Sequence, residues 1–201
     1  MDAGTRAFYE RYAATLDAQG EAALSAMSRR FAAADVAGAR VLDVGCGSGR
    51  DVAVLLAMGA DAYAVEPNAA MRERALQNHP QLAGRVADAA LPRLGRPFGG
   101  EFDVVVCSAV LMHLTPAQLP QALQALADVL VPGGRLLVAV PALDAARLRD
   151  GRDREDRLFT SHAPRTLVAL LAEHGIAPVD RSALTVDETH WTTLLLQRST
   201  G

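Results

Sequence analysis

The strongest constraint on the fold of this chain is an aliphatic run that leads into three alternating glycines, over residues 41–51. The sequence of this stretch is Val-Leu-Asp-Val-Gly-Cys-Gly-Ser-Gly-Arg-Asp. A short aliphatic run of this kind is typical of a buried parallel strand, and the apolar spacing over residues 52–58 predicts a helix packed on a sheet. Strand, glycine turn and helix form the first unit of a doubly wound α/β fold. The glycines allow a ligand to approach the backbone N–H groups at the start of the helix.

The spacing of these glycines separates two classes of ligand. A dinucleotide site requires G-x-G-x-x-G, but Arg50 occupies the position of the last glycine. Asp43 precedes the first glycine by two residues, and an acid at the end of a strand suits an ammonium or sulfonium group rather than a phosphate. The stretch resembles motif I, D-x-G-x-G-x-G, of the class I S-adenosylmethionine (SAM)-dependent methyltransferases. An NAD-type nucleotide site and a glycine turn without a ligand are the alternatives.

The composition narrows the class of protein further. At 201 residues, half of them apolar, the chain is long enough to bury the core of one soluble domain. Its 20 basic residues are all arginine. The lack of lysine excludes Schiff-base chemistry and a Walker A phosphate loop. No basic cluster is large enough to predict a nucleic-acid partner.

Targeting and redox features predict a cytoplasmic location. The N-terminus lacks the charged head and apolar core of a signal peptide, and no apolar run reaches membrane-spanning length. The two cysteines, Cys46 and Cys107, fit a reducing compartment. We interpret them as small buried side chains, with a functional disulfide between neighbouring strand ends as the alternative.

The N-terminal residues 1–36 are expected to form a helical cap. Aromatic and leucine side chains recur there mostly at three- and four-residue steps, and Gly20 is expected to divide the segment into two helices. Tyr9 and Tyr12 are candidates to cover the mouth of a cofactor or substrate site. Simple packing of an amphipathic cap over the sheet is the alternative role.

Aliphatic runs predict six further strands after the first. Glu66 follows the strand at residues 61–65, where a doubly wound fold accepts hydrogen bonds from ribose hydroxyls. It fits SAM and NAD equally, and a charge that stabilises the start of a helix is its alternative role. Asp88 follows the short strand at residues 85–87. The remaining strands are expected at residues 102–107, 136–140, 176–184 and 190–198.

The order of these motifs over residues 41–140 is similar to that of small bacterial stand-alone class I methyltransferases. Two strings carry this likeness besides motif I, namely V-L-M-H-L from residue 110 and L-x-P-G-G-x-L-L-V from residue 130. The resemblance implies an α/β, Rossmann-like, doubly wound fold with a seven-stranded sheet in the order 3-2-1-4-5-7-6, strand 7 being antiparallel. It implies one domain over residues 1–201, with a cofactor-binding half at 40–141 and a substrate side at 142–201.

The same resemblance implies SAM as the cofactor and S-adenosylhomocysteine (SAH) as the product. Asp88 would accept a hydrogen bond from the adenine amino group, and the N–H of Ala89 would donate to an adenine ring nitrogen. A turn-forming aspartate is the alternative role of Asp88. The cofactor-binding residues that we expect are Asp43, Gly45, Cys46, Gly47, Gly49, Asp51, Glu66, Asp88, Ala89 and Ser108.

The expected reaction is in-line transfer of the sulfonium methyl group to an O, N or other nucleophile of a small molecule. His113 is the first candidate for a catalytic base, because neutral imidazole is available near pH 7; a packed or cofactor-contacting histidine is the alternative. Tyr9, Tyr12, Arg152 and Trp191 are the candidate substrate-binding residues. The five histidines are scattered, so no metal site is predicted.

Residues 142–160 are rich in arginine and aspartate. This composition indicates a solvated loop, and a mobile lid whose arginine binds an acidic substrate group is the second interpretation. The strand at 102–107 is not followed by [N/D]-P-P-[Y/F], which disfavours methylation of adenine or glutamine amines, and Cys107 lacks the preceding proline of cytosine-C5 enzymes. A SAM-binding regulatory module without transferase activity and an NAD-type enzyme are the other functions considered. No motif encodes the acceptor or the oligomeric state.

Overall fold

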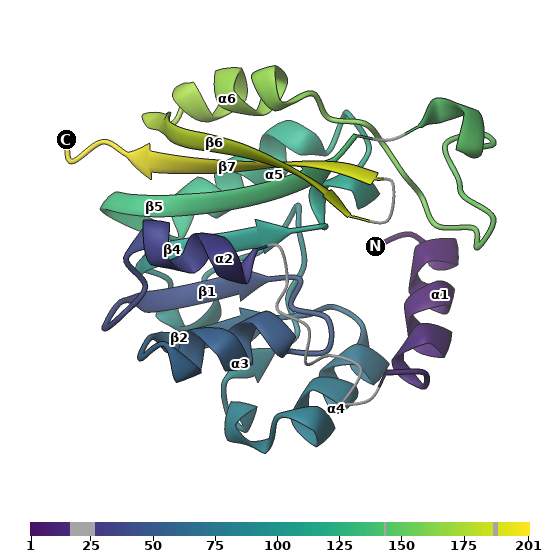
Figure 1. The fold of residues 1–201 in the computed structure, drawn as a ribbon, viewed down its shortest axis with the longest axis horizontal. Helices are drawn as coiled ribbons and strands as arrows, with labels where there is room; N and C mark the ends of the chain where they lie inside the picture. Colours follow the sequence, from purple (N-terminus) through teal and green to yellow (C-terminus); the bar gives the residue numbers. More distant parts are fainter. Residues whose placement is uncertain (17–26, 143, 187–188) are drawn as a thin grey trace.

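The computed structural model describes residues 1–16, 27–142, 144–186 and 189–201. Its centre is a seven-stranded sheet in the order β3-β2-β1-β4-β5-β7-β6 (Figure 1). The first five strands run parallel, and β7 pairs antiparallel with both β5 and β6. The predicted strand order and direction are therefore confirmed. The strands are β1 (Arg40–Val44), β2 (Asp61–Val65), β3 (Val86–Ala87), β4 (Phe102–Ser108), β5 (Leu130–Pro141), β6 (Ile176–Val186) and β7 (Thr189–Arg198).

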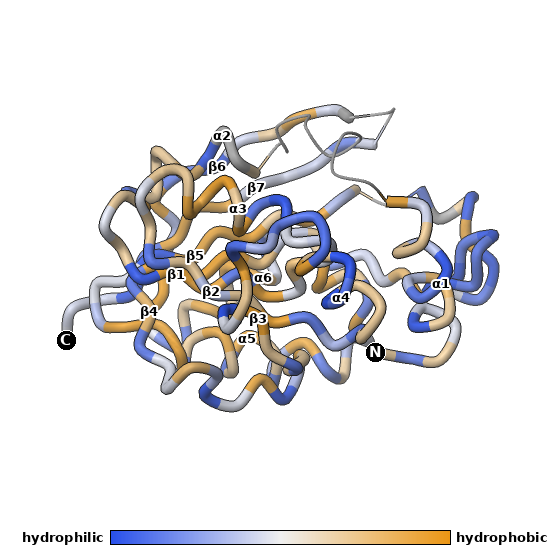
Figure 2. Tube along the Cα trace, turned by 90° about the horizontal axis from the view of Figure 1, so that it is seen from below, coloured by the Kyte–Doolittle hydropathy of each residue, from blue (hydrophilic) through white to orange (hydrophobic). Residues whose placement is uncertain are grey.

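Helices cover both faces of this sheet because its central strands are apolar on both sides. Along β4, Val105 and Cys107 face the cluster that contains α5 and α6, whereas Val104 and Val106 face the cluster that contains α2 and α3. Figure 2 shows the hydrophobic segments concentrated in the strands. Strands that are buried on both faces read as continuous aliphatic runs, which is why these segments lack alternation. The helices are α1 (Ala3–Ala13), α2 (Ser28–Phe31), α3 (Arg50–Ala57), α4 (Ala69–Asn78), α5 (Leu119–Asp128) and α6 (Pro164–Ala172), with 3₁₀ turns η1 (Ala32–Ala34), η2 (Pro80–Leu82), η3 (Pro97–Gly99), η4 (Leu111–His113) and η5 (Ala145–Arg147).

The N-terminal region divides into two parts with different positions. Helix α1 lies beyond the carboxyl ends of the strands, where Figure 1 shows it apart from the layered body. Met27 and Phe31 are instead fully buried against the sheet, in one cluster with Val41 and Val52. Their apolar side chains draw α2 onto the body, so the helical cap is α1. The break predicted at Gly20 lies outside the described residues.

The boundaries of several elements differ from those predicted. Strand β5 begins at Leu130 rather than 136, because a register shift between Phe102 and Val104 of β4 extends the pairing across the glycine turn. Helix α5 begins at Leu119 with a proline in its first turn. Before it, the Thr115 N–H donates to Gln118 Oε1 at 2.9 Å, so these two residues close a turn ahead of the helix. Within the described segments, no helix has the length and apolar character needed to cross a membrane.

Candidate active site

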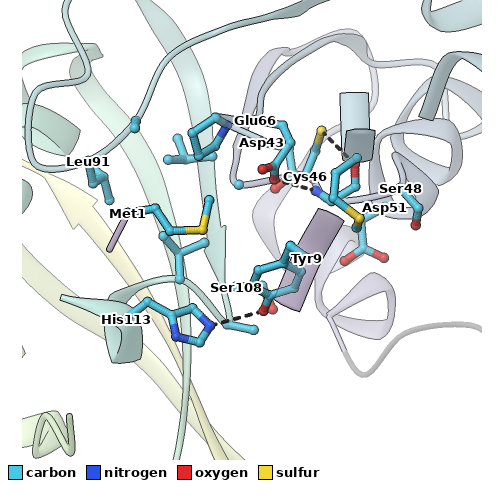
Figure 3. A pocket seen from close by; sticks show the side chains of 18 of the residues that line it. Met1, Tyr9, Asp43, Cys46, Ser48, Asp51, Glu66, Leu91, Ser108 and His113 are labelled. Carbon is cyan, nitrogen blue, oxygen red and sulfur yellow. Dashed lines mark hydrogen bonds between the residues drawn. The ribbon is translucent and has the colours of Figure 1, made fainter. Parts of the chain in front are cut away.

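A cavity of about 510 Å³ opens at the carboxyl ends of β1, β2 and β4. The glycine loop after β1 forms one wall, and residues of α1, including Tyr9 and Tyr12, form another. Figure 3 shows side chains from these separate segments converging on the same space. This edge of a doubly wound sheet is where ligands bind, and the volume is in the range of small-molecule pockets.

The glycine loop owes its path to left-handed backbone conformations. Gly45, Gly47 and Gly49 have φ of +79°, +58° and +83°. A Cβ on Gly45 would overlap Val110 Cγ2, and one on Gly49 would lie 2.6 Å from Leu82 Cδ1. Gly45 therefore lets the segment after β4 approach the cavity wall, and Gly49 lets α3 start against the neighbouring helical turn.

Glu66 ties the end of β2 to this loop. Its Oε2 accepts the Gly47 N–H at 3.0 Å, and its Oε1 accepts the Asn68 N–H at 2.8 Å. Burial raises the pKa of Glu66, and the two backbone donors oppose that rise. Each carboxylate oxygen keeps a second lone pair for a ligand hydroxyl.

Asp43 is the least compensated charge of the site. The residue lines the cavity and is 4% exposed, and none of the described residues donates a hydrogen bond to its carboxylate. Burial first, then the negative charges of Asp51 and Glu66, raise its pKa well above the ordinary value, and Arg50 opposes the rise. A buried carboxylate without a partner is unfavourable, so this site is complementary to a cation.

The charge of the cavity lining disfavours a pyrophosphate and favours a sulfonium. Asp43, Asp51 and Glu66 line the cavity, and among the described lining residues Arg50 alone carries an arginine charge. That guanidinium faces Asp51 with an N···O distance of 3.4 Å. The net charge around the glycine loop is therefore negative when the acids are ionised.

Tyr9 and His113 meet across the cavity. The Tyr9 hydroxyl lies 3.1 Å from His113 Nε2, and their rings are edge-on with centroids 5.8 Å apart (Figure 3). His113 Nδ1 lies 2.7 Å from the Leu158 carbonyl oxygen, which only accepts hydrogen bonds. Nδ1 therefore carries the proton, and Nε2 of the neutral ring accepts the proton of Tyr9. Burial lowers the pKa of His113 and raises the pKa of Tyr9, so both groups are neutral near pH 7.

The structure brings most of the predicted site residues to this cavity. The lining includes Tyr9, Tyr12, Asp43, Gly45, Cys46, Gly47, Asp51, Glu66, Ala89, Ser108 and His113. Cys46 and Cys107 are both free, and burial raises the pKa of each thiol.

Four predicted residues lie outside the lining. Gly49 packs against Leu82 instead. Asp88, with a side chain 67% exposed, pairs with Arg72 at 3.2 Å beside the cavity. The guanidinium of Arg152 pairs with Asp2 at 2.8 Å. Trp191 packs on the sheet face that contains α3.

Two contributions to the site were not predicted from the sequence. The Leu158 carbonyl orients His113, and Ala109 adopts a left-handed φ of +59° where β4 ends in the cavity. A backbone carbonyl leaves no residue-type signature, and alanine is not a residue that signals positive φ. Neither feature could have been read from the chain. Among the described residues, no group of three or more histidine, cysteine or acidic side chains is placed to hold a metal ion.

Fold and cavity together define a class I, SAM-dependent type of methyltransferase. The model of the Methyltransferase domain family matches residues 16–180, and the chain belongs to this family. It is 31% identical over 157 residues to an uncharacterized methyltransferase of Geobacillus kaustophilus, a match that covers 72% of each protein.

Two further similarities concern proteins with named activities. A protein-L-isoaspartate O-methyltransferase of Methylorubrum extorquens is 36% identical over 145 residues, which cover 70% of this chain and 59% of that protein. The crystal structure of Burkholderia thailandensis 1,6-didemethyltoxoflavin-N1-methyltransferase, with that compound and SAH bound, superposes with a TM-score of 0.71 at 21% identity. That superposition covers 99% of this chain and 92% of the other, and it shows that the two share a fold.

Proposed function

We propose that this protein transfers the methyl group of SAM to a hydroxyl or amine of a small, uncharged molecule, with Tyr9 and His113 receiving the proton. The observation that carries the proposal is the carboxylate of Asp43, which is buried at the glycine loop without a hydrogen-bond donor among the described residues. SAM carries an ammonium and a sulfonium, and either cation near Asp43 would compensate its charge. An NAD-type ligand would instead bring the negative charge of a pyrophosphate close to Asp43, Asp51 and Glu66, which would repel it.

The residues around the loop fit the remaining parts of SAM. Glu66 has free lone pairs for the ribose hydroxyls, and its two backbone donors hold the carboxylate in place. Ala89 lines the cavity beside Asp88, so the adenine end would lie against this turn. We assign Asp88 there as a rim contact, because its side chain is largely exposed. Arg152 and Trp191 carry no substrate contact in this proposal.

The acceptor end of the cavity is apolar. Leu16, Leu91, Val110 and Leu114 line the cavity together with the Tyr9–His113 pair. Arg157, whose charge lowers the pKa of both Tyr9 and His113, does not line the cavity; it is paired with Asp153 and stacked on the Phe8 ring. The charged side chains of the lining lie at the end of β1, the start of α3 and the end of β2, around the glycine loop, so the acceptor itself should be neutral. The N1-methyltransferase from B. thailandensis, crystallised with 1,6-didemethyltoxoflavin bound, supports a small-molecule acceptor.

The reaction needs little from the protein beyond alignment and proton removal. SAM supplies a methyl group on a sulfonium, which leaves as the neutral thioether when the acceptor O or N forms its bond to the methyl carbon. The acceptor proton passes to the Tyr9 oxygen while Tyr9 gives its own proton to His113 Nε2. Proximity and desolvation in the covered cavity supply the rest of the rate enhancement.

Calorimetric titration of the purified protein with SAM, SAH and NAD tests this proposal. We expect saturable binding of SAM and SAH, none of NAD, and at least tenfold weaker SAM binding to Asp43→Asn, because a charge-assisted hydrogen bond contributes about 1.5–3 kcal/mol. Production of SAH with a panel of neutral phenols and amines then distinguishes an enzyme from a binding module. Binding of NAD in preference to SAM would overturn the proposal, and tight SAM binding without turnover would favour a regulatory module.

A further inference from the structure

We propose that Arg157 is a positioning residue for methyl transfer, because its guanidinium joins the two phenylalanine rings that pack against Tyr9 and His113. The proposal rests on the function proposed above, and it adds a residue that does not line the cavity. Its basis is a closed cycle of side-chain contacts that runs through helix α1, the turn η4 and the loop at residues 149–160.

The cycle consists of five side chains. In α1 the rings of Phe8 and Tyr9 meet edge-on with centroids 5.1 Å apart, and Tyr9 contacts His113 of η4 at the cavity (Figure 3). The His113 ring also packs on Phe159 of the loop, with centroids 5.0 Å apart. The Arg157 Cζ lies 4.3 Å from the ring centroid of Phe8 and 5.0 Å from that of Phe159. These two rings make no ring contact with each other in the described part of the chain, so Arg157 closes the cycle.

Asp153 fixes the plane of the Arg157 guanidinium. Its Oδ2 accepts the Nε–H of Arg157 at 2.7 Å and lies 2.6 Å from Nη2, while its Oδ1 accepts the backbone N–H of Arg157 at 2.9 Å. Hydrogen bonds in the plane of a guanidinium leave its faces free for aromatic rings. The side chains of Arg157 and Asp153 are only 27% and 18% exposed, and cation–π contacts are stronger when they are shielded from water.

The position of Tyr9 relative to His113 depends on this cycle. The relay requires the Tyr9 hydroxyl within hydrogen-bond distance of His113 Nε2, and a displacement of about 1 Å costs about 10²-fold in rate. Tyr9 belongs to α1, whereas His113 follows β4, and the guanidinium holds a ring next to each of them. Arg157 therefore restrains the two catalytic side chains without touching the acceptor.

Other contacts keep α1 attached when Arg157 is altered. The Arg74 Nε–H donates to the Ala13 carbonyl at 2.8 Å at the end of the helix, and the Leu158 N–H donates to Thr5 Oγ1 at 2.9 Å near its start. A variant that lacks the guanidinium should therefore fold, with α1 still above the cavity.

Charged groups on the surrounding elements provide a second measurement. Burial lowers the pKa of His113 most, and the positive charge of Arg157 lowers it further. Asp2 beside α1 and Asp153 of the loop raise this pKa, as does the hydrogen bond with the Leu158 carbonyl. Removing the charge of Arg157 should thus raise the pKa of His113, and removing that of Asp153 should lower it. Loosened packing would instead hydrate the ring and raise the pKa in both variants.

The test is NMR of protein with ¹³C-labelled tyrosine and histidine, recorded with and without saturating SAH. An NOE between the rings of Tyr9 and His113 reports their contact, and the pH titration of the His113 signal reports its pKa. The variants are Arg157→Met, which keeps an unbranched stem and removes the guanidinium, and Asp153→Asn. Arg165→Met, on the exposed face of α6, is the matched control. Tyr9→Phe and His113→Gln identify the two signals.

We expect the NOE in the wild type and in Arg165→Met, and its loss or strong reduction in Arg157→Met. The pKa of His113 should rise in Arg157→Met and fall in Asp153→Asn. With an active acceptor, Arg157→Met should lose about tenfold in kcat at unchanged SAH affinity, because the relay is misaligned while the cofactor site is intact.

An NOE of wild-type strength in folded Arg157→Met would overturn the inference. A rise of the His113 pKa in Asp153→Asn would overturn it as well, and this result does not require that Arg157→Met folds. Failure of SAH to bind would instead refute the proposed function, and the NOE of the free protein would still decide whether Arg157 holds the pair together.

Discussion

Glu66 Oε2 accepts the backbone N–H of Gly47 at 3.0 Å, which joins the end of β2 to the loop that follows β1. The same carboxylate accepts the Asn68 N–H, and the Asn68 side chain donates to the Arg6 carbonyl of α1 at 3.2 Å. Glu66, which we assign to the ribose, thus also links the glycine loop to the start of α4. Through Asn68 it is connected to α1, the helix above the cavity. Ligand affinity and loop geometry should therefore change together when Glu66 is altered.

Replacing Glu66 by alanine should weaken SAH binding by at least tenfold and lower the stability of the protein without ligand. Two buried N–H groups would lose their acceptor, and each unsatisfied donor costs about 1–3 kcal/mol. Calorimetry measures the affinity, and urea unfolding measures the free energy of unfolding. Glu73→Ala is the control, because this acid lies on the exposed side of α4, the helix that follows Glu66, and accepts a hydrogen bond from Gln77. Equal behaviour of the two variants would contradict the assignment of Glu66.

SAM binding should release a proton from Asp43. The pKa of this carboxyl is raised by burial and by neighbouring acids, so a bound cation lowers it again. Affinity for SAM should accordingly rise with pH across the interval between the two pKa values. Calorimetry in two buffers of different ionisation enthalpy measures the number of protons released on binding. Asp43→Asn should abolish the dependence of the binding enthalpy on the buffer. Uptake of a proton, or the same release by Asp43→Asn, would show that another group titrates.

The raised pKa of Asp43 also predicts how stability depends on pH in the absence of ligand. A carboxyl whose folded-state pKa lies above its unfolded value of about 3.9 stabilises the fold fully below that value. This contribution is lost as the pH rises through the folded-state pKa. Asp43→Asn should remove this loss and raise the melting temperature near neutral pH, because a buried charge without a partner is replaced by a neutral amide. A lower melting temperature of Asp43→Asn at pH 7 would contradict this account.

The sequence predicts the sheet better than it predicts the site. The aliphatic runs locate the strands, because side-chain burial on two faces leaves a strong pattern, whereas the strand order was implied by the resemblance to class I methyltransferases. The wall formed by Asp43, Gly47 and Glu66 follows from the same reasoning. The contacts made by α1 and by the loop at residues 149–160 are harder to predict, because tertiary packing and backbone groups decide which partners these residues have.

Arg152 illustrates this difference. An arginine in a loop of mixed charge suits a substrate anion as well as an internal acid, and the sequence does not distinguish them. In the structure the internal acid is Asp2, 150 residues away along the chain. Asp88 follows β3 and Trp191 lies in β7, as predicted. Their side chains do not line the cavity, because Asp88 pairs with Arg72 and Trp191 packs on the face of the sheet that contains α3.

Gly45 should be far less tolerant of alanine than Gly59. Both have positive φ, +79° and +87°, so each substitution strains the backbone by about 1–2 kcal/mol. A Cβ at Gly59 meets no atom within 4 Å, whereas one at Gly45 overlaps the Val110 side chain in the cavity wall. Urea unfolding should show the larger loss of stability for Gly45→Ala, and SAH binding should weaken in that variant alone. Equal losses would mean that Val110 moves aside without consequence for the site.

Tyr9 and His113 should affect the rate of methyl transfer rather than the binding of SAH. Removing either group breaks the relay, and general-base catalysis contributes about 10²–10⁴-fold. Tyr9→Phe and His113→Gln should therefore lower kcat by roughly similar factors, and the double variant should lose little more than either one, because the two groups act as a unit.

The pH dependence gives an independent check on this relay. Burial lowers the pKa of His113, and the base works in its neutral form, so the acid limb of kcat/KM should lie below the ordinary histidine value of about 6.5. His113→Gln should abolish this limb, while Tyr12→Phe, which alters the exposed tyrosine of the same helix, should retain it. An acid limb that persists in His113→Gln would assign the base to another group, and additive losses in the double variant would show that Tyr9 and His113 act separately.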